Sequence, residues 1–149
     1  MTAPASNIRH FEVQASSAPV FGRVLCSARN HHIVVDGPLY NGCPGEELVP
    51  PELFLLAVAS CGVELMHVIA RDETIPLQHA AIDVERFVDR DNQPRTDVTL
   101  FNKVLLKARL RGVDRAQAKT LVDGFTRRCP IFGSIKVAAL EVKVEYDVE

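Results

Sequence analysis

The chain lacks any run of five like-charged side chains, and its 17 basic and 19 acidic residues give a formal net charge of −2 over 149 residues. Without a basic patch or stripe, the sequence carries no electrostatic signature of binding to nucleic acid or to an anionic membrane. It also lacks internal repeats and low-complexity segments. Since 47% of the residues are hydrophobic and 24% are charged, the composition is that of an ordinary globular protein. Small-molecule chemistry is therefore the first function class to consider.

A secretory signal and a convincing membrane span are also missing. Residues 1–7 have neither a basic start nor an apolar middle, so we expect a disordered tail on a cytoplasmic protein. The strongest apolar stretch, residues 53–70, includes Glu64 and His67. Its length is at the lower limit for a membrane span, and a glutamate in mid-span is costly in lipid. We therefore predict a buried core helix within a single domain over residues 1–149.

The sequence has four cysteines but no Cys-x-x-Cys pair, and the intervals between them match no zinc ribbon or finger. A chain of this length buries enough surface to fold without a metal or a disulfide. In a reducing cytoplasm Cys26, Cys43, Cys61 and Cys129 are expected to be free thiols. We expect no metal and no resident cofactor, so the cysteines need another explanation.

Apolar patterns in the first half of the chain predict strands followed by a helix. Residues 8–15, 20–26 and 31–35 follow one another at hairpin spacing and predict three strands. Glycine and proline are frequent in residues 36–51, which predicts a long surface loop. The two prolines that end this loop suit the first turn of a helix running to about Arg71. Because this helix is apolar on nearly every side, we expect it to be buried centrally.

The second half of the chain predicts a hairpin, two helices and a last strand. Residues 82–88 and 98–110 alternate around a polar turn and predict an antiparallel hairpin with one buried face. Asp114 is a good N-cap for a helix whose apolar stripe extends to Cys129, so Cys129 should face inward. Pro130 then begins a short helix through residue 135, and residues 140–148 alternate as a strand. The predicted order is βββ-α-ββ-α-(α)-β, an α+β fold.

Two of the cysteines have surroundings that suit chemistry as well as packing. Cys61 lies in the middle of the long helix among small residues, and Gly62 beside it costs the helix about 1 kcal/mol relative to alanine. Cys129 lies at the start of a helix and follows Arg127 and Arg128, and both features favour the thiolate. The alternative for each cysteine is the role of a small buried hydrophobe.

The run PELFLLAVASC at residues 51–61, followed late in the chain by Cys129-Pro130, resembles the signature of the OsmC/Ohr family. The Gly/Pro-rich loop before the run and the segment from His32 to Gly37 match as well. The resemblance spans roughly residues 20–146 and is closest to the general OsmC-like branch. It implies an intertwined homodimer in which antiparallel sheets wrap around two long central helices, with active sites at the interface.

The resemblance also implies an enzyme of oxidative stress defence, an organic hydroperoxide reductase that depends on a dithiol. By position, Cys61 is the peroxidatic residue, whose thiolate attacks the peroxide, releases an alcohol and becomes a sulfenic acid. Cys129 is then the resolving residue, which forms a disulfide with Cys61. A dithiol or lipoyl-type reductant reopens that disulfide.

The cationic partner of the thiolate departs from the family pattern. Peroxidases of the family use an arginine from the N-terminal strands, held by a glutamate ten residues before the cysteine, where this chain has Pro51. Glu52 lies nine residues before Cys61, and on an ideal helix this spacing of about 900° places it on the opposite side. We interpret Glu52 first as a complement to the helix dipole. Arg23 and Arg29 are the candidate arginines, and Arg29 is the better placed.

Glu64 adds a second departure, because an anion three residues after Cys61 on the same helix face raises the thiol pKa. An alternative function therefore stays open: an OsmC-like protein without peroxidase activity that binds a small apolar ligand or senses redox state through its thiols. A third alternative is a purely structural module for dimerisation. We interpret His67 as a core or interface residue and Cys26 as strand packing. Cys43 is a loop thiol that interferes with or supplements resolution.

Overall fold

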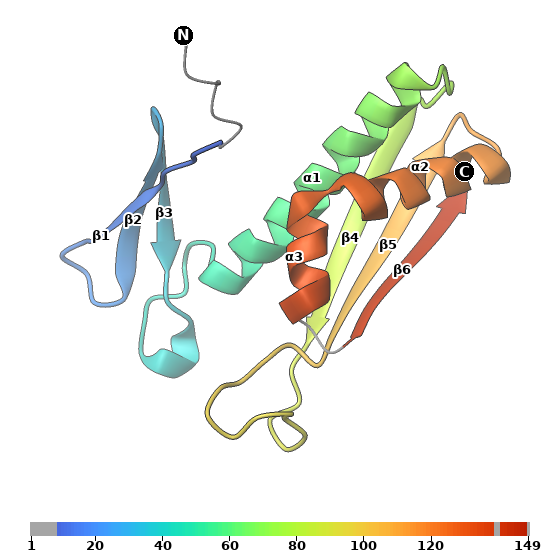
Figure 1. The fold of residues 1–149 in the computed structure, drawn as a ribbon. Helices are drawn as coiled ribbons and strands as arrows, with labels where there is room; N and C mark the ends of the chain where they lie inside the picture. Colours follow the sequence, from blue (N-terminus) through green and yellow to red (C-terminus); the bar gives the residue numbers. More distant parts are fainter. Residues whose placement is uncertain (1–8, 139–140, 149) are drawn as a thin grey trace, which may run out of the picture. The chain divides into compact units, whose positions relative to one another are not determined.

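The computed structural model describes residues 9–138 and 141–148, and its element order confirms the predicted α+β pattern (Figure 1). The predicted disordered tail over residues 1–7 lies outside the described residues. The chain divides between Leu53 and Phe54 into two compact units. The elements are β1 (Gln14–Ser17), β2 (Arg23–Ala28), β3 (His31–Asp36), a short 3-10 helix η1 (Leu39–Asn41), α1 (Pro50–Asp72), β4 (His79–Phe87), β5 (Lys103–Arg111), α2 (Arg115–Arg128), α3 (Pro130–Ala138) and β6 (Glu141–Val148).

The N-terminal unit contains an antiparallel sheet in the order β1-β2-β3. Its first strand is shorter than the predicted strand over residues 8–15. Because Gln14 pairs with Ser27, the residues before it run past the end of β2, where the chain turns at Arg29 with a φ of 55°. Residues 9–13 therefore have no strand partner within the described sheet. The other two strands lie where the sequence predicts them, within a few residues.

Asp36 anchors the Gly/Pro-rich loop to the end of β3. Its carboxylate is fully buried and accepts hydrogen bonds from the backbone N–H groups of Glu46 and Glu47, at 3.0 and 3.1 Å. It also receives both arms of the Arg23 guanidinium, at 2.8 and 2.9 Å. These hydrogen bonds, the arginine's above all, hold the pKa of Asp36 well below its ordinary value. The buried Asp36 carboxylate thus ties the loop to the sheet, because it accepts hydrogen bonds from loop N–H groups and from the Arg23 guanidinium.

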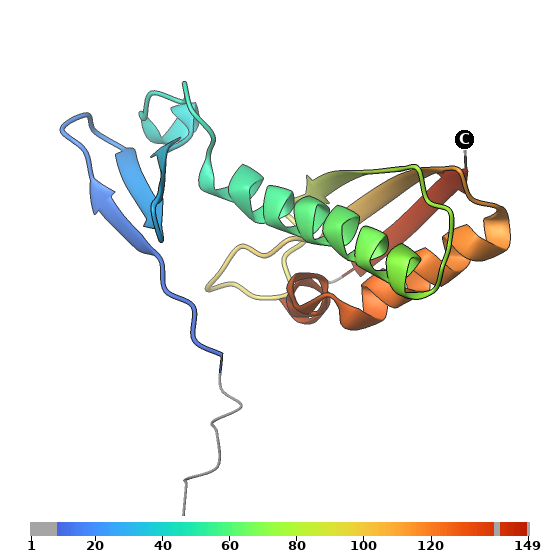
Figure 2. The ribbon, with the colours of Figure 1, turned by 90° about the horizontal axis from the view of Figure 1, so that it is seen from above.

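The C-terminal unit is a two-layer structure in which α1, α2 and α3 cover one face of the β4-β5-β6 sheet (Figures 1 and 2). The predicted hairpin exists, and residues 104, 106, 108 and 110 of β5 form its buried face. The predicted second strand is too long, because residues 98–102 belong to the connecting loop. There the Gln93 side chain accepts a hydrogen bond from Leu100 N at 2.7 Å and donates one to Asn102 Oδ1 at 2.9 Å. These side-chain bonds replace a strand ladder.

The last strand pairs differently from the predicted antiparallel sheets. β6 lies parallel to β5, with Leu106 opposite Val144. Two parallel neighbours need a long crossover connection, and here α2 and α3 supply it. The two helices therefore carry the chain from the end of β5 back to the end of the sheet at which β5 and β6 both begin.

Within the described part of the C-terminal unit, α1 is covered on one side only. Val58, Met66 and Ile69 are at most 1% exposed in the core, whereas Leu56, on another side of the helix, is 51% exposed. The expected burial on every side is therefore not met within the described residues of the C-terminal unit. By length and composition α1 would also pass as a membrane span, with a mean hydropathy of 2.1 over 18 residues. Since its other side packs against the sheet, we interpret it as a core helix.

Candidate redox site

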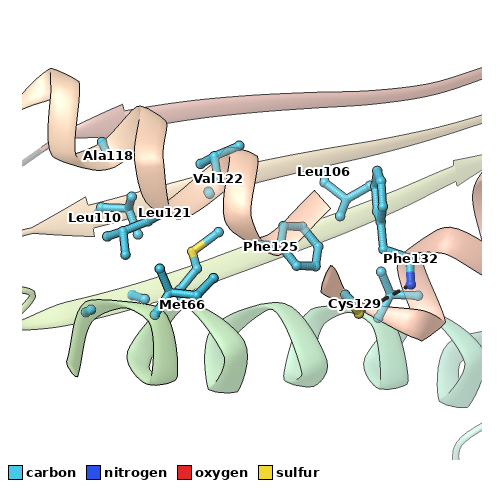
Figure 3. Close-up of a cluster of buried hydrophobic side chains, with 14 of the residues drawn as sticks. Met66, Leu106, Leu110, Ala118, Leu121, Val122, Phe125, Cys129 and Phe132 are labelled. Carbon is cyan, nitrogen blue, oxygen red and sulfur yellow. Dashed lines mark hydrogen bonds between the residues drawn. The ribbon is translucent and has the colours of Figure 1, made fainter. Parts of the chain in front are cut away.

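Cys61 and Cys129 meet in the C-terminal unit, with their Sγ atoms 2.7 Å apart although 68 residues separate them in the sequence. Cys61 comes from the middle of α1. Cys129, labelled in Figure 3, lies between α2 and α3. A disulfide has an S–S distance of about 2.05 Å, so the two sulfurs can bond after a shift of less than about 1 Å. The pair needs no rearrangement of the backbone to be oxidised.

The sequence of α2 explains why Cys129 points at α1. Asp114 and Gln117 form a reciprocal capping box that fixes the start of the helix. From there a buried stripe runs along one face through Phe125 to Cys129, which is 3% exposed (Figure 3). The predicted inward orientation of Cys129 is confirmed. The remaining members of the stripe are Ala118, Leu121 and Val122.

The start of α3 presents backbone N–H groups to both sulfurs. Cys129 Sγ accepts a hydrogen bond from Phe132 N at 3.3 Å, the bond that an N-cap side chain makes (Figure 3). The backbone N–H of Ile131 interacts with Cys61, and this contact favours its thiolate. The predicted N-cap position of Cys129 is confirmed. Residue types alone do not reveal that the backbone N–H groups of Ile131 and Phe132 belong to the site. The signal in the sequence is Pro130, which marks the start of the helix whose first turn leaves these N–H groups unpaired.

Gly62 lets α1 approach the rest of the core beside Cys61. A Cβ atom at this position would lie 2.5 Å from Ile82 Cδ1 and 3.1 Å from Phe125 Cε2. A larger residue would therefore displace the end of the Ile82 side chain and crowd the Phe125 ring. The glycine costs helix stability but keeps Cys61 within reach of Cys129.

The surroundings of Cys61 favour its protonated form. Burial raises the pKa of Cys61 from 9.0 to about 12, with smaller contributions from the Cys129 contact and from the charge of Glu64. The Ile131 N–H acts in the opposite direction. The predicted effect of Glu64 is confirmed in sign. Thiolate chemistry at Cys61 therefore requires a positive charge beyond those that its neighbours in the C-terminal unit supply.

Neutralising Glu64 is expected to speed alkylation of Cys61. In Glu64→Gln the anion that raises the thiol pKa is gone, so the thiolate fraction at pH 8 should rise about threefold at low salt. The rate of iodoacetamide labelling at Cys61, followed by peptide mass spectrometry, measures this change. Glu73→Gln removes the same charge from an exposed residue just beyond α1 and should leave the rate unchanged. Equal rates in all three proteins would contradict the expectation.

The other predicted site residues belong to the N-terminal unit. Glu52 Oε2 accepts a hydrogen bond from Val49 N at 2.9 Å at the start of α1, which agrees with its interpretation as a helix-terminal carboxylate. Arg23 binds Asp36 and also Glu46, at 2.7 Å. Arg29 occupies the β2–β3 turn with a positive φ. Of the two candidate arginines, Arg23 is the one held by carboxylates, and Asp36 is the partner that sequence reasoning missed.

Cys43, Cys26 and His67 lie outside the thiol pair. Cys43 Sγ packs against Gly22 and Gly37, where added Cβ atoms would lie 2.3 and 2.4 Å from it. Cys26 is half-buried in β2, as expected for strand packing. His67 is exposed on α1 rather than in the core. Among residues 9–138 and 141–148, no group of three or more His, Cys, Asp or Glu side chains could hold a metal ion.

An α+β element order, a long apolar helix and a thiol pair at the start of a short helix define the class of this protein. The OsmC-like protein family profile matches residues 44–145, which is more than half of the chain. The chain therefore belongs to the OsmC-like family, as the sequence resemblance predicts. None of the curated proteins compared with the chain matches it significantly.

Solved structures share the fold over nearly the whole chain. A hypothetical protein from Aquifex aeolicus is 15% identical, with a TM-score of 0.78 covering 95% of this chain and 98% of that one. An organic hydroperoxide resistance protein from Legionella pneumophila is 18% identical, with a TM-score of 0.76 and coverages of 95% and 99%. A Vibrio cholerae protein assigned to organic hydroperoxide resistance, with captopril in one of its active sites, is 21% identical, with a TM-score of 0.71 and coverages of 95% and 95%.

Proposed function

We propose that this protein is a thiol-dependent peroxidase that reduces organic hydroperoxides to alcohols. The observation that carries the proposal is the contact of Cys61 and Cys129 at 2.7 Å beside the start of α3. Two thiols this close can be converted to a disulfide and back without unfolding. Relatives in Legionella and Vibrio that carry the name of organic hydroperoxide resistance agree with this chemistry.

The difference in exposure supports the two proposed roles. Cys61 is partly exposed and serves as the nucleophile, whereas Cys129 is 3% exposed and serves as the resolving thiol. The Cys61 thiolate attacks one peroxide oxygen, the O–O bond breaks, and the alkoxide takes up a proton and leaves as the alcohol. Cys129 then attacks the sulfenic sulfur of Cys61, and water leaves as the disulfide forms. A dithiol of lipoyl type returns both cysteines to thiols and is itself oxidised.

A second copy of the chain is part of this proposal. The exposed apolar side of α1, with Leu56 51% exposed, needs a cover that the described residues of the C-terminal unit do not provide. A cytoplasmic homodimer would supply this cover and could bring Arg23 or Arg29 to the thiolate. Such a cation would lower the pKa of Cys61, against the effects of burial and Glu64.

Turnover with a small hydroperoxide tests the proposed activity. The reduced protein should consume cumene hydroperoxide or tert-butyl hydroperoxide continuously when dihydrolipoamide is supplied, measured as loss of peroxide. After one equivalent of peroxide without reductant, peptide mapping should find Cys61 joined to Cys129. Absence of turnover with dihydrolipoamide and with other dithiols would overturn the proposal.

The raised pKa of Cys61, about 12, favours a second candidate function. A protonated thiol reacts slowly with peroxide, which suits a redox sensor that is oxidised once and reduced slowly. In that case stoichiometric peroxide still yields the Cys61–Cys129 disulfide, but dithiols support no continuous turnover. The two experiments above therefore separate the two functions.

A further inference from the structure

Cys61 and Cys129 meet as two sulfurs in an apolar surrounding. Cys129 is part of the hydrophobic core of the C-terminal unit, and Cys61 packs against that core. Their Sγ atoms lie 2.7 Å apart. Over residues 9–138 and 141–148, no set of three His, Cys, Asp or Glu side chains is placed to hold a metal ion. An ion bound here would therefore have the two sulfurs as its only ligands of these types.

The number and kind of these ligands decide which ion the pair suits. Zinc sites in proteins take three or four protein ligands, and calcium and magnesium take oxygen ligands. Thiolate sulfur is a soft ligand, which favours Cu(I) over the hard ions. A Cu(I) ion is satisfied by two thiolates in a nearly linear arrangement. Two sulfurs without a third partner therefore match Cu(I) better than Zn²⁺.

The electrostatic surroundings of Cys61 favour a bound cation. Burial, the contact with Cys129 and the charge of Glu64 raise the pKa of Cys61 to about 12, so its sulfur keeps a proton. A metal ion takes the place of that proton, since a coordinating thiol is deprotonated outright. The Glu64 carboxylate, which opposes a bare thiolate, attracts a cation. The ion thus supplies the positive charge that the neighbours of Cys61 in the C-terminal unit do not.

The start of α3 suits the complex that would form. Two thiolates and one Cu(I) carry a net charge of −1, and a charge in an apolar surrounding needs hydrogen-bond donors. Phe132 N donates to Cys129 Sγ at 3.3 Å, and the backbone N–H of Ile131 interacts with Cys61. Hydrogen bonds to ligand atoms orient them and tune the metal in protein sites. Each sulfur of the pair already has such a donor.

The two cysteines differ in their access to solvent. Cys61 is partly exposed, whereas Cys129 is 3% exposed. An ion therefore reaches the pair from the side of Cys61. The contact between the sulfurs has to open to admit an ion between them. Rotation of the Cys61 side chain towards solvent opens it while Cys129 stays in place in the core.

We propose that the reduced Cys61–Cys129 pair is a two-coordinate site for Cu(I), and that oxidation of the pair to a disulfide releases the ion. On binding, two S–H bonds break, two Cu–S bonds form, and both protons pass to water without any change of oxidation state. A two-electron oxidant of thiols then takes the electrons of the two thiolates and two protons from water. The Cu–S bonds break, the S–S bond forms, and copper leaves as Cu(I). Copper binding goes beyond the proposed peroxidase activity and does not depend on it.

Competition with the chelator bicinchoninate under argon measures the affinity for copper. The reduced wild type should take one Cu(I) per chain from the coloured chelate. Cys61→Ser and Cys129→Ser should each weaken binding by at least about a hundredfold, because losing a ligand costs more than losing an outer-shell partner. Cys26→Ser and Cys43→Ser change cysteines outside the pair and should bind like the wild type. Wild type oxidised with diamide, with the Cys61–Cys129 disulfide verified by peptide mapping, should hold no copper.

X-ray absorption at the copper edge tests the coordination in the unmutated protein. The spectrum should show two sulfur neighbours and no nitrogen or oxygen, and a third ligand overturns the site. So do copper binding by the oxidised wild type, wild-type affinity in Cys61→Ser or Cys129→Ser, and loss of copper in Cys26→Ser or Cys43→Ser. One Zn²⁺ per chain held as tightly as Cu(I) overturns the selection for a soft ion. Absence of hydroperoxide turnover in a protein that binds one Cu(I) overturns the peroxidase function and leaves the copper site standing.

Discussion

The Cys61→Ser variant is expected to lose hydroperoxide consumption by at least about a thousandfold, to the rate of the reductant alone. A serine hydroxyl at this half-buried position cannot supply the anion that attacks the O–O bond. Because Cys61 is partly exposed and Cys129 is 3% exposed, the remaining cysteine should not replace it. The measurement is peroxide loss with dihydrolipoamide at several pH values.

Two further variants test the resolving role of Cys129 and the specificity of the Cys61 effect. Cys129→Ser should release one equivalent of alcohol per chain and then stop, because the sulfenic acid at Cys61 has no resolving thiol. Cys26→Ser changes a half-buried strand cysteine outside the pair and should keep full turnover. Continuous turnover in Cys61→Ser would rule out Cys61 as the nucleophile, and a normal rate in Cys129→Ser would remove Cys129 from the cycle.

The Phe125→Ala variant is expected to lose about 3–5 kcal/mol of unfolding free energy, the usual cost of truncating a buried phenylalanine. Phe125 is fully buried, packs against Phe132 with ring centroids 5.2 Å apart, and lies against the Gly62 position of α1. The cavity would open between α1, α2 and the start of α3. Urea unfolding followed by circular dichroism measures the loss.

The packing around Phe125 also holds the two sulfurs together, so the variant has a second readout. Disulfide formation between Cys61 and Cys129 after one equivalent of peroxide should become slower in Phe125→Ala. Val137→Ala removes an apolar side chain that is 90% exposed on α3 and should change neither stability nor disulfide formation appreciably. Wild-type stability in Phe125→Ala would show that this cluster is not the core that the contacts indicate.

The sequence predicts the element order and the inward direction of Cys129 because both follow from periodic patterns, whereas the pairing of Cys129 with Cys61 is implied only by the family resemblance. The stripe of α2 runs in register to Cys129, and Pro130 marks a helix start, so the inward direction of this cysteine can be read from spacing. Gly62 is also visible in the sequence as an unfavourable helix residue. Its reason, the approach of Ile82 and Phe125, depends on tertiary packing.

Contacts between distant segments are what the sequence does not reveal. Strand pairing depends on where the crossover delivers β6, so the parallel partner of β5 cannot be read from the alternation in β6 itself. Asp36 looks like a loop residue until Arg23 and two backbone N–H groups are seen to converge on it. Arg86 looks like one of the polar positions of β4, and only the position of Phe101 beside it distinguishes it.

Because a long stretch of chain separates Cys61 from Cys129, a disulfide between them would lower the conformational entropy of the unfolded protein. A cross-link over a loop of this length restricts the unfolded chain by about 4 kcal/mol in the loop-closure treatment. That amount is a large part of the total stability of an ordinary domain. An oxidised molecule should therefore outlast a reduced one under heat or proteolysis, so that exposure to peroxide would lengthen the lifetime of the protein.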